Sequence, residues 1–390
     1  MWKLKIQIKD SDMQKLNVKK NVQELLEPSD VQINGRRPWD IQIHNPNFYE
    51  RVLSGGSLSL GESYMDGWWD CEALDQFFER ILENRLDKKV KINIILALYV
   101  IFKEKIINAQ NRSKAYEIGK RHYDIGNNLF SNMLDKWLNY SCGYWDNVNT
   151  LDDAQESKMD LICRKIDLKP GMEVLDIGCG WGGFAKYSAI KYGATIHGIT
   201  VSKGQVELAN KFCQGLDVKI ELKDYRELKE KKYDRIISIG MFEHVGRKNY
   251  RTFMKVAHRC LKDDGIFLLH TIGGNTSVHS TDPWINKYIF PNSMLPSAKQ
   301  ITSAGEGLFV LEDWHNFGQY YDNTLMAWHK NFTKNWGRLS DKYDERFYRM
   351  WTYYLLSCAG SFRSRRNQLW QILFSKRGIK NGYQYRREPV

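Results

Sequence analysis

The chain has 390 residues, a formal net charge of +12 and 42% hydrophobic residues. This length predicts two to three domains, and this composition predicts a folded rather than a disordered chain. The longest apolar run, residues 92–102, is eleven residues long, short of the roughly 20 that a membrane-spanning helix needs.

The N-terminus alternates charged and apolar residues and lacks the apolar core of a signal peptide. Seven cysteines form an odd set without a CxxC pair. That pattern is typical of reduced thiols and favours neither a disulfide framework nor a bound metal. We therefore expect a cytoplasmic protein with no metal site.

Positive charge is concentrated in two stretches. Residues 88–121 hold nine Lys and Arg against two Glu, and residues 363–388 hold eight against one. Such stretches attract nucleic acid or an anionic membrane surface, or are simply solvated. Composition alone leaves these options open, although an aromatic content of 13% modestly favours an apolar or lipid ligand.

Three regions follow one another along the chain. Residues 1–102 form an N-terminal domain that ends in an apolar helix predicted over 74–102. Residues 103–121 are polar and charged, which is typical of a linker. Residues 122–390 form the third region, in which strands and helices alternate from about residue 151 onward.

That alternation predicts a parallel, doubly wound α/β sheet. The predicted strands are 173–177, 194–200, 217–222, 233–239, 265–271 and 367–376. The predicted helices are 183–192, 202–213, 248–261, 318–336 and 341–359.

The strongest local motif is VLDIGCGWGG, residues 174–183. A strand that ends in Asp176 runs into Gly178 and Gly180 before a helix begins. Glycine permits positive φ and lets a ligand approach the backbone closely, and the helix N-terminus offers free N–H groups to an anion. The spacing G-x-G-x-G-G differs from the dinucleotide-binding G-x-G-x-x-G.

The D-x-G-x-G arrangement resembles motif I of the class I S-adenosylmethionine-dependent methyltransferases. This resemblance implies a seven-stranded class I sheet, preceded here by a smaller N-terminal domain. Members often carry an acidic residue after the second strand, where this chain has Thr200, so the ribose contact is expected to pass to Thr200 or Gln205. Asp224 and Tyr225 follow the third strand and suit the adenine amine and ring.

The segment after the fourth strand, SIGMFEHVG, lacks the Asn/Asp-Pro-Pro-aromatic sequence of enzymes that methylate amino groups of nucleic acid or protein. Several other segments together resemble the cyclopropane fatty acid synthase family, in order from about residue 30 to the end. They are GESYMDGWWDC (61–71), HYDIGNNLF (122–130), NYSCGYW (139–145), MFEHVGRKNY (241–250), LLHTIG (268–273), DPWINKYIFPN (282–292), EDWHNFG (312–318), YDNTLMAW (321–328) and CAGSFR (358–363).

The resemblance implies the chemistry. The cis double bond of an unsaturated acyl chain attacks the methyl group of S-adenosylmethionine, and loss of a proton then closes a cyclopropane ring. Such a site needs a dry apolar channel, aromatic faces that stabilise positive charge, and one base. Tyr140 and Ser141 are implied as further cofactor contacts.

The resemblance also implies that the base is a bound bicarbonate. Its contacts would be the side chains of Cys142, Glu243, His270 and Tyr321, with the backbone of Ile272 nearby. Tyr and His donate to the ion, whereas Glu243 accepts from it. Cys358 matches a position marked as an active-site cysteine in the family, although methyl transfer to an alkene has no step for a thiolate.

An enzyme of this kind must dock on a bilayer to reach its unsaturated phospholipid substrate. The resemblance implies an N-terminal domain that binds lipid and forms a homodimer, and the apolar residues 92–102 lie either at the membrane interface or in the domain core. We expect peripheral association with the inner face of the cell membrane and no nucleic acid partner.

Two alternatives stay open. A lipid C-methyltransferase would use the same fold and leave a branched or methylene-substituted chain. A basic nucleic-acid-binding protein with a vestigial cofactor fold is the other, although the chain has no evident nucleic-acid-binding module.

Overall fold

The computed structural model describes residues 19–86, 126–229 and 231–384. The predicted linker, the apolar run 92–102 and the basic stretch 88–121 lie outside these residues. Among the described residues, no helix combines the length and the apolar character needed to cross a membrane.

The centre of the molecule is a seven-stranded sheet in the order β5-β4-β3-β6-β7-β9-β8. In chain order the strands are β3 (Glu173–Ile177), β4 (Thr195–Thr200), β5 (Val218–Leu222), β6 (Tyr233–Ile239), β7 (Leu261–Gly274), β8 (Val310–Asn316) and β9 (Asn367–Ser375). The first five are mutually parallel, whereas β9 runs antiparallel to both β7 and β8. The expected doubly wound α/β sheet is confirmed, but a fully parallel sheet is wrong at β9.

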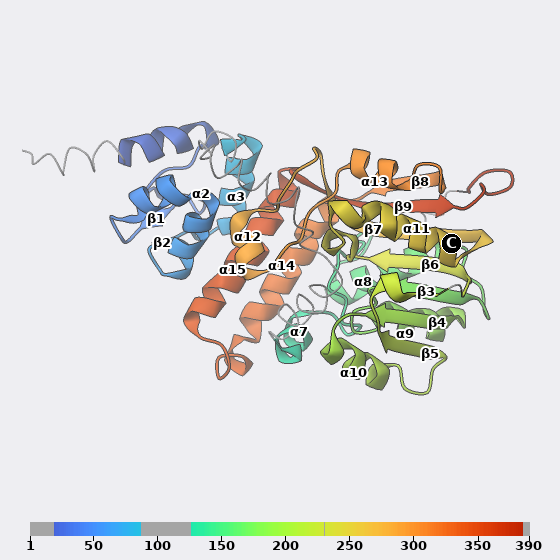
Figure 1. The fold of residues 1–390 in the computed structure, drawn as a ribbon. Helices are drawn as coiled ribbons and strands as arrows, with labels where there is room; N and C mark the ends of the chain where they lie inside the picture. The colour runs from blue at the N-terminus through green and yellow to red at the C-terminus, as the bar shows by residue number, and fades with distance from the viewer. Residues whose placement is uncertain (1–18, 87–125, 230, 385–390) are drawn as a thin grey trace, which may run out of the picture.

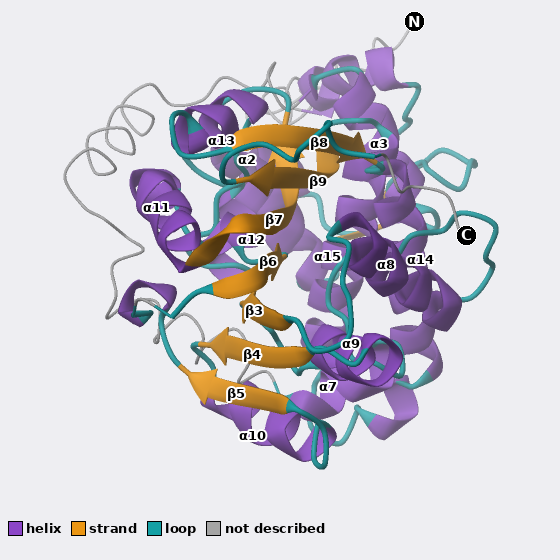
Figure 2. Ribbon diagram, turned by 90° about the vertical axis from the view of Figure 1, so that its right-hand side faces the viewer, coloured by secondary structure: helices purple, strands orange, loops and turns teal. Residues whose placement is uncertain are grey.

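Helices cover both faces of this sheet (Figure 2). One face is covered by α8 (Leu151–Lys165), α9 (Gly183–Tyr192) and α10 (Lys203–Phe212), whose buried side chains share a core with β3, β4 and β5. The other face is covered by α11 (Tyr250–Cys260) and α13 (Ala298–Gly305).

Local signals explain where several of these helices begin. The side chains of Thr150 and Ser202 accept hydrogen bonds from the backbone N–H groups of Asp153 and Gln205. Ser297 and Gln300 form a reciprocal capping box at the start of α13. Each cap satisfies N–H groups that the first helical turn leaves without a partner.

The N-terminal region contains a two-stranded sheet and the helices α2 and α3. These are β1 (Gln42–Ile43), β2 (Trp69–Asp70), α2 (Phe48–Met65) and α3 (Leu74–Glu83), after a short 3-10 turn at Glu27–Ser29. The predicted helix over 74–102 is wrong in length. It ends at Glu83 because Asn84 caps it and Arg85 adopts a left-handed φ of 54°.

Three helices connect the N-terminal region to the sheet (Figure 1). They are α12 (Pro283–Tyr288), α14 (Gln319–Lys334) and α15 (Glu345–Arg363); α7 (Asn127–Met133) packs beside α14. Phe77 of α3, Trp284 of α12 and Trp351 of α15 belong to one continuous hydrophobic core. The N-terminal region therefore folds against the catalytic region rather than around a core of its own.

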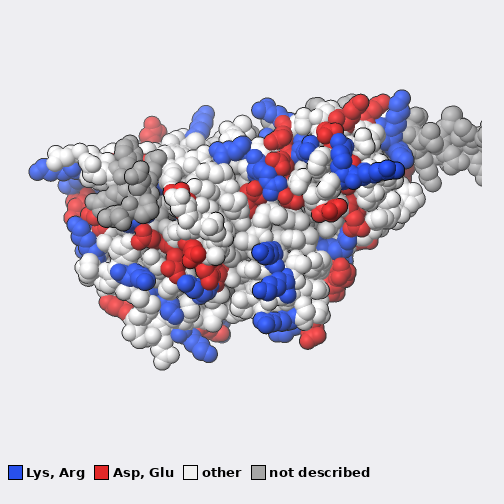
Figure 3. All heavy atoms as spheres, turned by 180° about the vertical axis from the view of Figure 1, so that it is seen from behind, with Lys and Arg blue, Asp and Glu red and all other residues white. Residues whose placement is uncertain are grey.

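Of the basic stretch 363–388, the structure describes residues up to 384, and the arginines and lysines on either side of β9 do not form one patch there. Arg363, Arg365 and Arg366 precede β9, whereas Lys376 and Arg377 follow it, so the nine-residue strand separates the two groups by about 30 Å. Lys376 and Arg377 both pair with Asp263. Figure 3 shows positive and negative side chains interspersed over the rear face.

Candidate active site

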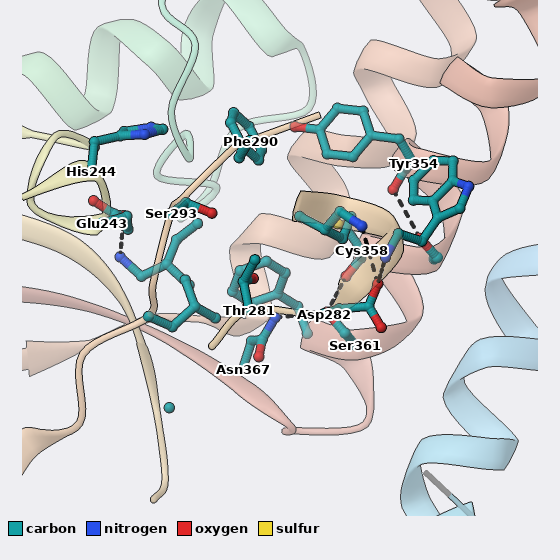
Figure 4. A pocket seen from close by; sticks show the side chains of 18 of the residues that line it. Glu243, His244, Thr281, Asp282, Phe290, Ser293, Tyr354, Cys358, Ser361 and Asn367 are labelled. Atoms are coloured by element: carbon teal, nitrogen blue, oxygen red, sulfur yellow. Dashed lines mark hydrogen bonds between the residues drawn. The ribbon is translucent and has the colours of Figure 1, made fainter. Parts of the chain in front are cut away.

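A cavity of about 1260 Å³ lies beyond the carboxyl ends of the central strands. Its wall combines the glycine turn after β3, the loops after β6 and β7, helices α14 and α15, and apolar side chains of the N-terminal region. In the close-up, Glu243 and Cys358 lie on opposite sides of this space (Figure 4). Open parallel α/β sheets commonly bind ligands at this edge.

The glycine turn lies at one end of the cavity. Gly178, Gly180 and Gly182 have φ values of 89°, 55° and 82°, which side chains other than glycine rarely adopt. Asp176 is 2% exposed, and its Oδ1 has no hydrogen-bond partner among the described residues. Burial raises the pKa of Asp176 to about 7. This buried acceptor and the open turn suit a polar ligand with a cationic group.

Thr200 and Gln205 lie beside this turn. The Thr200 hydroxyl donates to Gln205 Oε1 over 2.7 Å, and both residues line the cavity. A neutral pair therefore stands where relatives of the fold often place a carboxylate. The Gln205 amide N–H groups are the donors that this pair brings to a ligand.

Asp224 and Tyr225 also line the cavity. Arg226 holds the Asp224 carboxylate through Nε and Nη2, each over 2.7 Å. Burial raises the pKa of Tyr225 to about 12, and its buried hydroxyl has no hydrogen-bond partner in the described part of the chain. Arg226 thus orients the Asp224 carboxylate before any ligand binds, whereas the Tyr225 hydroxyl is available to a ligand.

The loop that carries Tyr140 and Ser141 is held by a lysine that the sequence reasoning missed. Lys158 of α8 is fully buried, and its Nζ donates to Ser141 Oγ over 2.9 Å and to Asn139 Oδ1 over 3.1 Å. Burial lowers the pKa of Lys158 to about 8. Lys158 lies four residues after Ala154 and four before Ile162. This helical spacing could have revealed a cation on the buried face of the helix.

Glu243 follows β6 in a short 3-10 turn, Phe242–His244. Its Oε1 accepts a hydrogen bond from the Ile272 N–H over 2.7 Å, and its buried Oε2 has no partner among the described residues. Burial raises the pKa of Glu243 to about 7. The site thus holds a carboxyl group that gains or loses its proton near neutral pH.

His270 lies on β7, two residues before Ile272, and is 1% exposed. Its Nδ1 is 3.2 Å from the Gln371 amide nitrogen of β9, and its buried Nε2 has no partner in the described residues. Burial lowers the pKa of His270 well below its ordinary value, so the ring is neutral. Donation by Gln371 to Nδ1 leaves the ring proton on Nε2. Sequence reasoning missed Gln371, whose role depends on the pairing of β7 with β9.

Tyr321 of α14 lines the cavity, whereas Cys142 does not. The Cys142 thiol is fully buried and donates to the Gly143 carbonyl over 3.1 Å. Burial raises the pKa of both side chains well above their ordinary values. Of the six predicted catalytic residues, the cavity wall includes Glu243, Ile272, Tyr321 and Cys358. Cys142 and His270 are buried behind this wall: Cys142 follows the wall residue Ser141, and His270 lies two residues before the wall residue Ile272.

Cys358 of α15 faces the cavity with its thiol in a dry environment. Burial raises the pKa of Cys358 to about 12, so the thiol stays protonated near neutral pH. A thiol in this state is a poor nucleophile. Cys358 therefore contributes to the apolar wall rather than to covalent chemistry.

Aromatic rings surround the space between Glu243 and Cys358. Tyr321 packs against Phe362 with ring centroids 4.5 Å apart, and Tyr140 packs against Trp328 at 5.2 Å. The Tyr140 hydroxyl is also 2.8 Å from that of Tyr354. Electron-rich ring faces stabilise a nearby positive charge in a site without water. In residues 19–86, 126–229 and 231–384, no three His, Cys, Asp or Glu side chains gather as ligands for a metal ion.

Comparison with known proteins identifies the family. The model of the mycolic acid cyclopropane synthetase family matches residues 110–372. The chain belongs to this family.

A relative that covers most of the chain and a solved structure that covers two thirds of it agree with this assignment. Cyclopropane-fatty-acyl-phospholipid synthase of Escherichia coli is 53% identical over 363 residues, which cover 92% of this chain and 93% of that protein. The cyclopropane synthase MmaA2 of Mycobacterium tuberculosis has a similar structure, with a TM-score of 0.63, 31% identity and coverage of 67% of this chain and 98% of that one.

A third relative carries ligands. The mycolic acid cyclopropane synthase CmaA1, solved with SAH and CTAB, has a TM-score of 0.62, 32% identity and coverage of 67% and 98%. These similarities confirm the class I methyltransferase fold. The enzyme is an S-adenosylmethionine-dependent methyltransferase, as the sequence predicted.

Proposed function

We propose that this enzyme transfers a methylene group from S-adenosylmethionine to the cis double bond of unsaturated acyl chains in phospholipids, forming a cyclopropane ring. One observation supports this most strongly: a single cavity contains the glycine turn, Glu243, aromatic walls and apolar side chains of the N-terminal region. A polar cofactor end and an apolar end are both needed when the second substrate is an acyl chain.

The cofactor end fits S-adenosylmethionine. We assign binding to Tyr140, Ser141, Asp176, Gly178, Gly180, Thr200, Gln205, Asp224 and Tyr225, of which all line the cavity. The unpartnered Asp176 Oδ1 suits the cofactor's ammonium group, and the unpartnered Tyr225 hydroxyl suits a polar atom of the nucleoside. When bound, the cofactor supplies a methyl group activated by its sulfonium charge.

The aromatic walls have a role in the reaction of the alkene. Attack by a double bond on a methyl group leaves positive charge on the acyl chain. The faces of Tyr140, Tyr321 and Phe290 stabilise that charge, and the surrounding apolar side chains exclude water that would capture it.

A proton must then leave the new methyl group. The residues around Ile272 suit a small oxyanion such as bicarbonate: the His270 Nε2–H and the Tyr321 hydroxyl are donors, and Glu243 Oε2 is an acceptor when ionised. When bound, bicarbonate supplies the base. Glu243, held by the Ile272 N–H, orients it. The Cys142 thiol donates its one proton to the Gly143 carbonyl, so its predicted contact with the ion would require this hydrogen bond to break.

We also propose that the enzyme works in the cytoplasm at the surface of the membrane, and that it forms a homodimer to which the N-terminal region contributes. The location follows from the substrate, because phospholipid acyl chains lie in bilayers. Size measurement of the intact chain in solution tests the dimer: elution at the mass of a single 45.9 kDa chain would refute it.

The decisive experiment incubates the enzyme with methyl-labelled S-adenosylmethionine and vesicles of an unsaturated phospholipid. We expect each modified acyl chain to gain one methylene unit, about 14 Da plus the mass of the isotope that it carries. Proton NMR of the isolated chains then separates a cyclopropane from a methylene-substituted or branched product. Loss of the expected ring signals despite a mass gain would favour the lipid C-methyltransferase, and an unchanged chain would refute the function.

A further inference from the structure

Few large apolar side chains are exposed in the described residues, and two of them line the cavity. Six such side chains are more than a third exposed, namely Leu53, Ile190, Leu222, Val278, Val310 and Leu311. Only Leu53 and Val278, each 39% exposed, are also part of the cavity wall. They therefore mark where the cavity meets solvent.

These two residues come from different regions of the chain. Leu53 lies in α2, three residues before a break at Gly56, where φ is 57° and ψ is −138°. Val278 lies between β7 and α12, in the exposed polar stretch 275–280. Residues of both segments line the cavity, so its wall has one side from the N-terminal region and one from the catalytic region.

The two sides meet at a fixed contact. Gly61 of α2 lies against the Trp284 ring of α12 so closely that a Cβ atom at this glycine would be 2.4 Å from the ring. Nearby, Glu62 Oε1 accepts from Lys287 Nζ over 2.6 Å. Leu53 and Val278 extend away from this contact along α2 and along the loop before α12. The contact thus fixes α2, which contains Leu53, against α12, the helix that follows Val278 in the chain.

Polar groups elsewhere on the cavity wall suit a lipid headgroup. Arg85 and Arg366 line the same cavity, as do the hydroxyl residues Thr276 and Ser280. Guanidinium and hydroxyl groups recognise phosphate. Apolar side chains projecting beside such groups are typical of surfaces that bind a bilayer at the level of the headgroups.

We propose that Leu53 and Val278 are two apolar lips that insert into the phospholipid bilayer, and that the acyl chain enters the cavity between them. This inference rests on the proposed lipid substrate and adds the membrane-contacting residues. The lips place the entrance below the headgroups, so that a chain leaves the bilayer without crossing water.

Fluorescence tests the insertion directly. Among the described cysteines, Cys358 alone is half-buried and the others are buried, so a Cys358→Ser background permits single labelling at Leu53→Cys or Val278→Cys with a polarity-sensitive NBD dye. Vesicles of dioleoyl phosphatidylglycerol and phosphatidylethanolamine should shift the emission of both labels to shorter wavelength. Lipids with a nitroxide in the acyl chain should quench them. Ile190→Cys, which is 49% exposed on α9 and outside the cavity wall, is the matched control and should show neither effect.

Kinetics gives a second measurement with different variants. Leu53→Ser with Val278→Ser should lower kcat/KM for vesicle lipid about tenfold, the effect of losing roughly one apolar anchor's contribution to binding. Affinity for S-adenosylmethionine should be unchanged, and Ile190→Ser should behave as the unaltered enzyme.

The outcomes separate this inference from the proposed function. Labels at 53 and 278 that remain in water, while the unaltered enzyme modifies the same vesicles, would overturn the lips and leave the function intact. Failure of the unaltered enzyme to modify any acyl chain would instead refute the function. Equal kinetic losses in the Ile190→Ser control would also count against the lips.

Discussion

Burial acts in opposite directions on two ionisable side chains near Ile272. It raises the pKa of Glu243 to about 7 and lowers that of His270 well below its ordinary range. Near neutral pH the site therefore combines a neutral imidazole with a carboxyl group close to half ionisation. Such a pair can hold an anion and exchange a proton without creating a second buried charge.

Glu243→Gln keeps the size of the side chain and its hydrogen bond to the Ile272 N–H but removes the negative charge. We expect kcat to fall by at least about 100-fold, the lower range for a group that assists proton transfer. Affinity for S-adenosylmethionine, measured by calorimetry, should stay within about twofold. An unchanged kcat would remove Glu243 from the mechanism.

The same group predicts a pH dependence. Because the raised pKa keeps Glu243 protonated below pH 7, the rate should rise with pH and level off above about 7. In Glu243→Gln this rising part of the profile should disappear. If the titration of Asp176 caused the rise, the rise would remain in this variant. Stability has the opposite sign: the native state retains the Glu243 proton that the unfolded chain loses, so this group's contribution to stability falls as pH rises from 4.5 to 7.

Gln371 contacts His270 and is not part of the cavity wall, so we expect it to act by positioning the His270 ring. Gln371→Met should keep the packing but allow the ring proton on either nitrogen, so kcat should fall about tenfold. Nitrogen NMR shifts of the histidine ring should show one tautomer in the unaltered enzyme and a mixture in the variant. Gln368→Met, at another buried glutamine of β9, should leave the His270 shifts unchanged; a change there would argue against a specific role of Gln371.

At the scale of elements, the turn between β3 and α9 combines positive φ with close packing. A Cβ atom at Gly178 would be 2.7 Å from Met241 Cβ, and its φ is 89°. Gly171, with a φ of 79° and no atom within 4 Å, is strained in the same way but lies outside the cavity wall.

Gly178→Ala should therefore weaken S-adenosylmethionine binding at least about tenfold, since a shift of the turn moves the backbone that contacts the cofactor. Gly171→Ala should lower thermal stability without weakening binding. Comparison of these two variants separates the loss of stability caused by positive φ from the effect on cofactor binding. Equal affinities in the two variants would show that the turn does not hold the cofactor.

Elements with strong local signals were predicted from the sequence. The strand 173–177 and the helix 183–192 have the predicted bounds, because an apolar run, glycines and a following helix lie next to one another in the chain. The strand β8 was not predicted. Its residues VLEDWHN form an edge strand with mostly accessible side chains, and only pairing with β9 identifies it.

Features that depend on distant contacts were harder to predict. The direction of β9 and the contact of Gln371 with His270 arise from the pairing of β7 with β9, which nothing within either segment specifies. The predicted cofactor residues from Asp176 to Tyr225 all line one cavity, because they follow the carboxyl ends of successive strands; their role in binding stays a prediction. Lys158 was missed because its partners Asn139 and Ser141 lie in a loop without a regular pattern.

At the scale of the whole molecule, Arg363 joins the N-terminal region to two helices of the catalytic region. Its guanidinium holds Asp75 of α3 over 2.7 Å and both oxygens of Asp322 of α14 over 2.8 Å. Arg363 belongs to α15, so one side chain connects three helices. The Asp partners hold the pKa of Arg363 above its ordinary value.

Arg363→Ala should lower the free energy of unfolding by about 2 kcal/mol, between the values for exposed and buried ion pairs. Denaturant titration measures this, and protease should cut the N-terminal region sooner in the variant. Arg377→Ala removes an arginine whose side chain is 72% exposed beside Asp263 and should cost less than about 0.5 kcal/mol. Equal losses in the two variants would show that the Arg363 contacts add no stability.

The core shared by α2, α3 and α15 also limits how members of this family can be recombined. Gly360 of α15 lies so close to α3 that a Cβ atom there would be 2.5 Å from the Asp75 carbonyl oxygen, and Tyr353 packs against Tyr64 and Phe78. A hybrid that joins the first 86 residues of one synthase to the remainder of another would bring together two surfaces shaped for different partners. A transplant of lipid preference from one relative to another should therefore include both the N-terminal region and the face of α15 that packs against it.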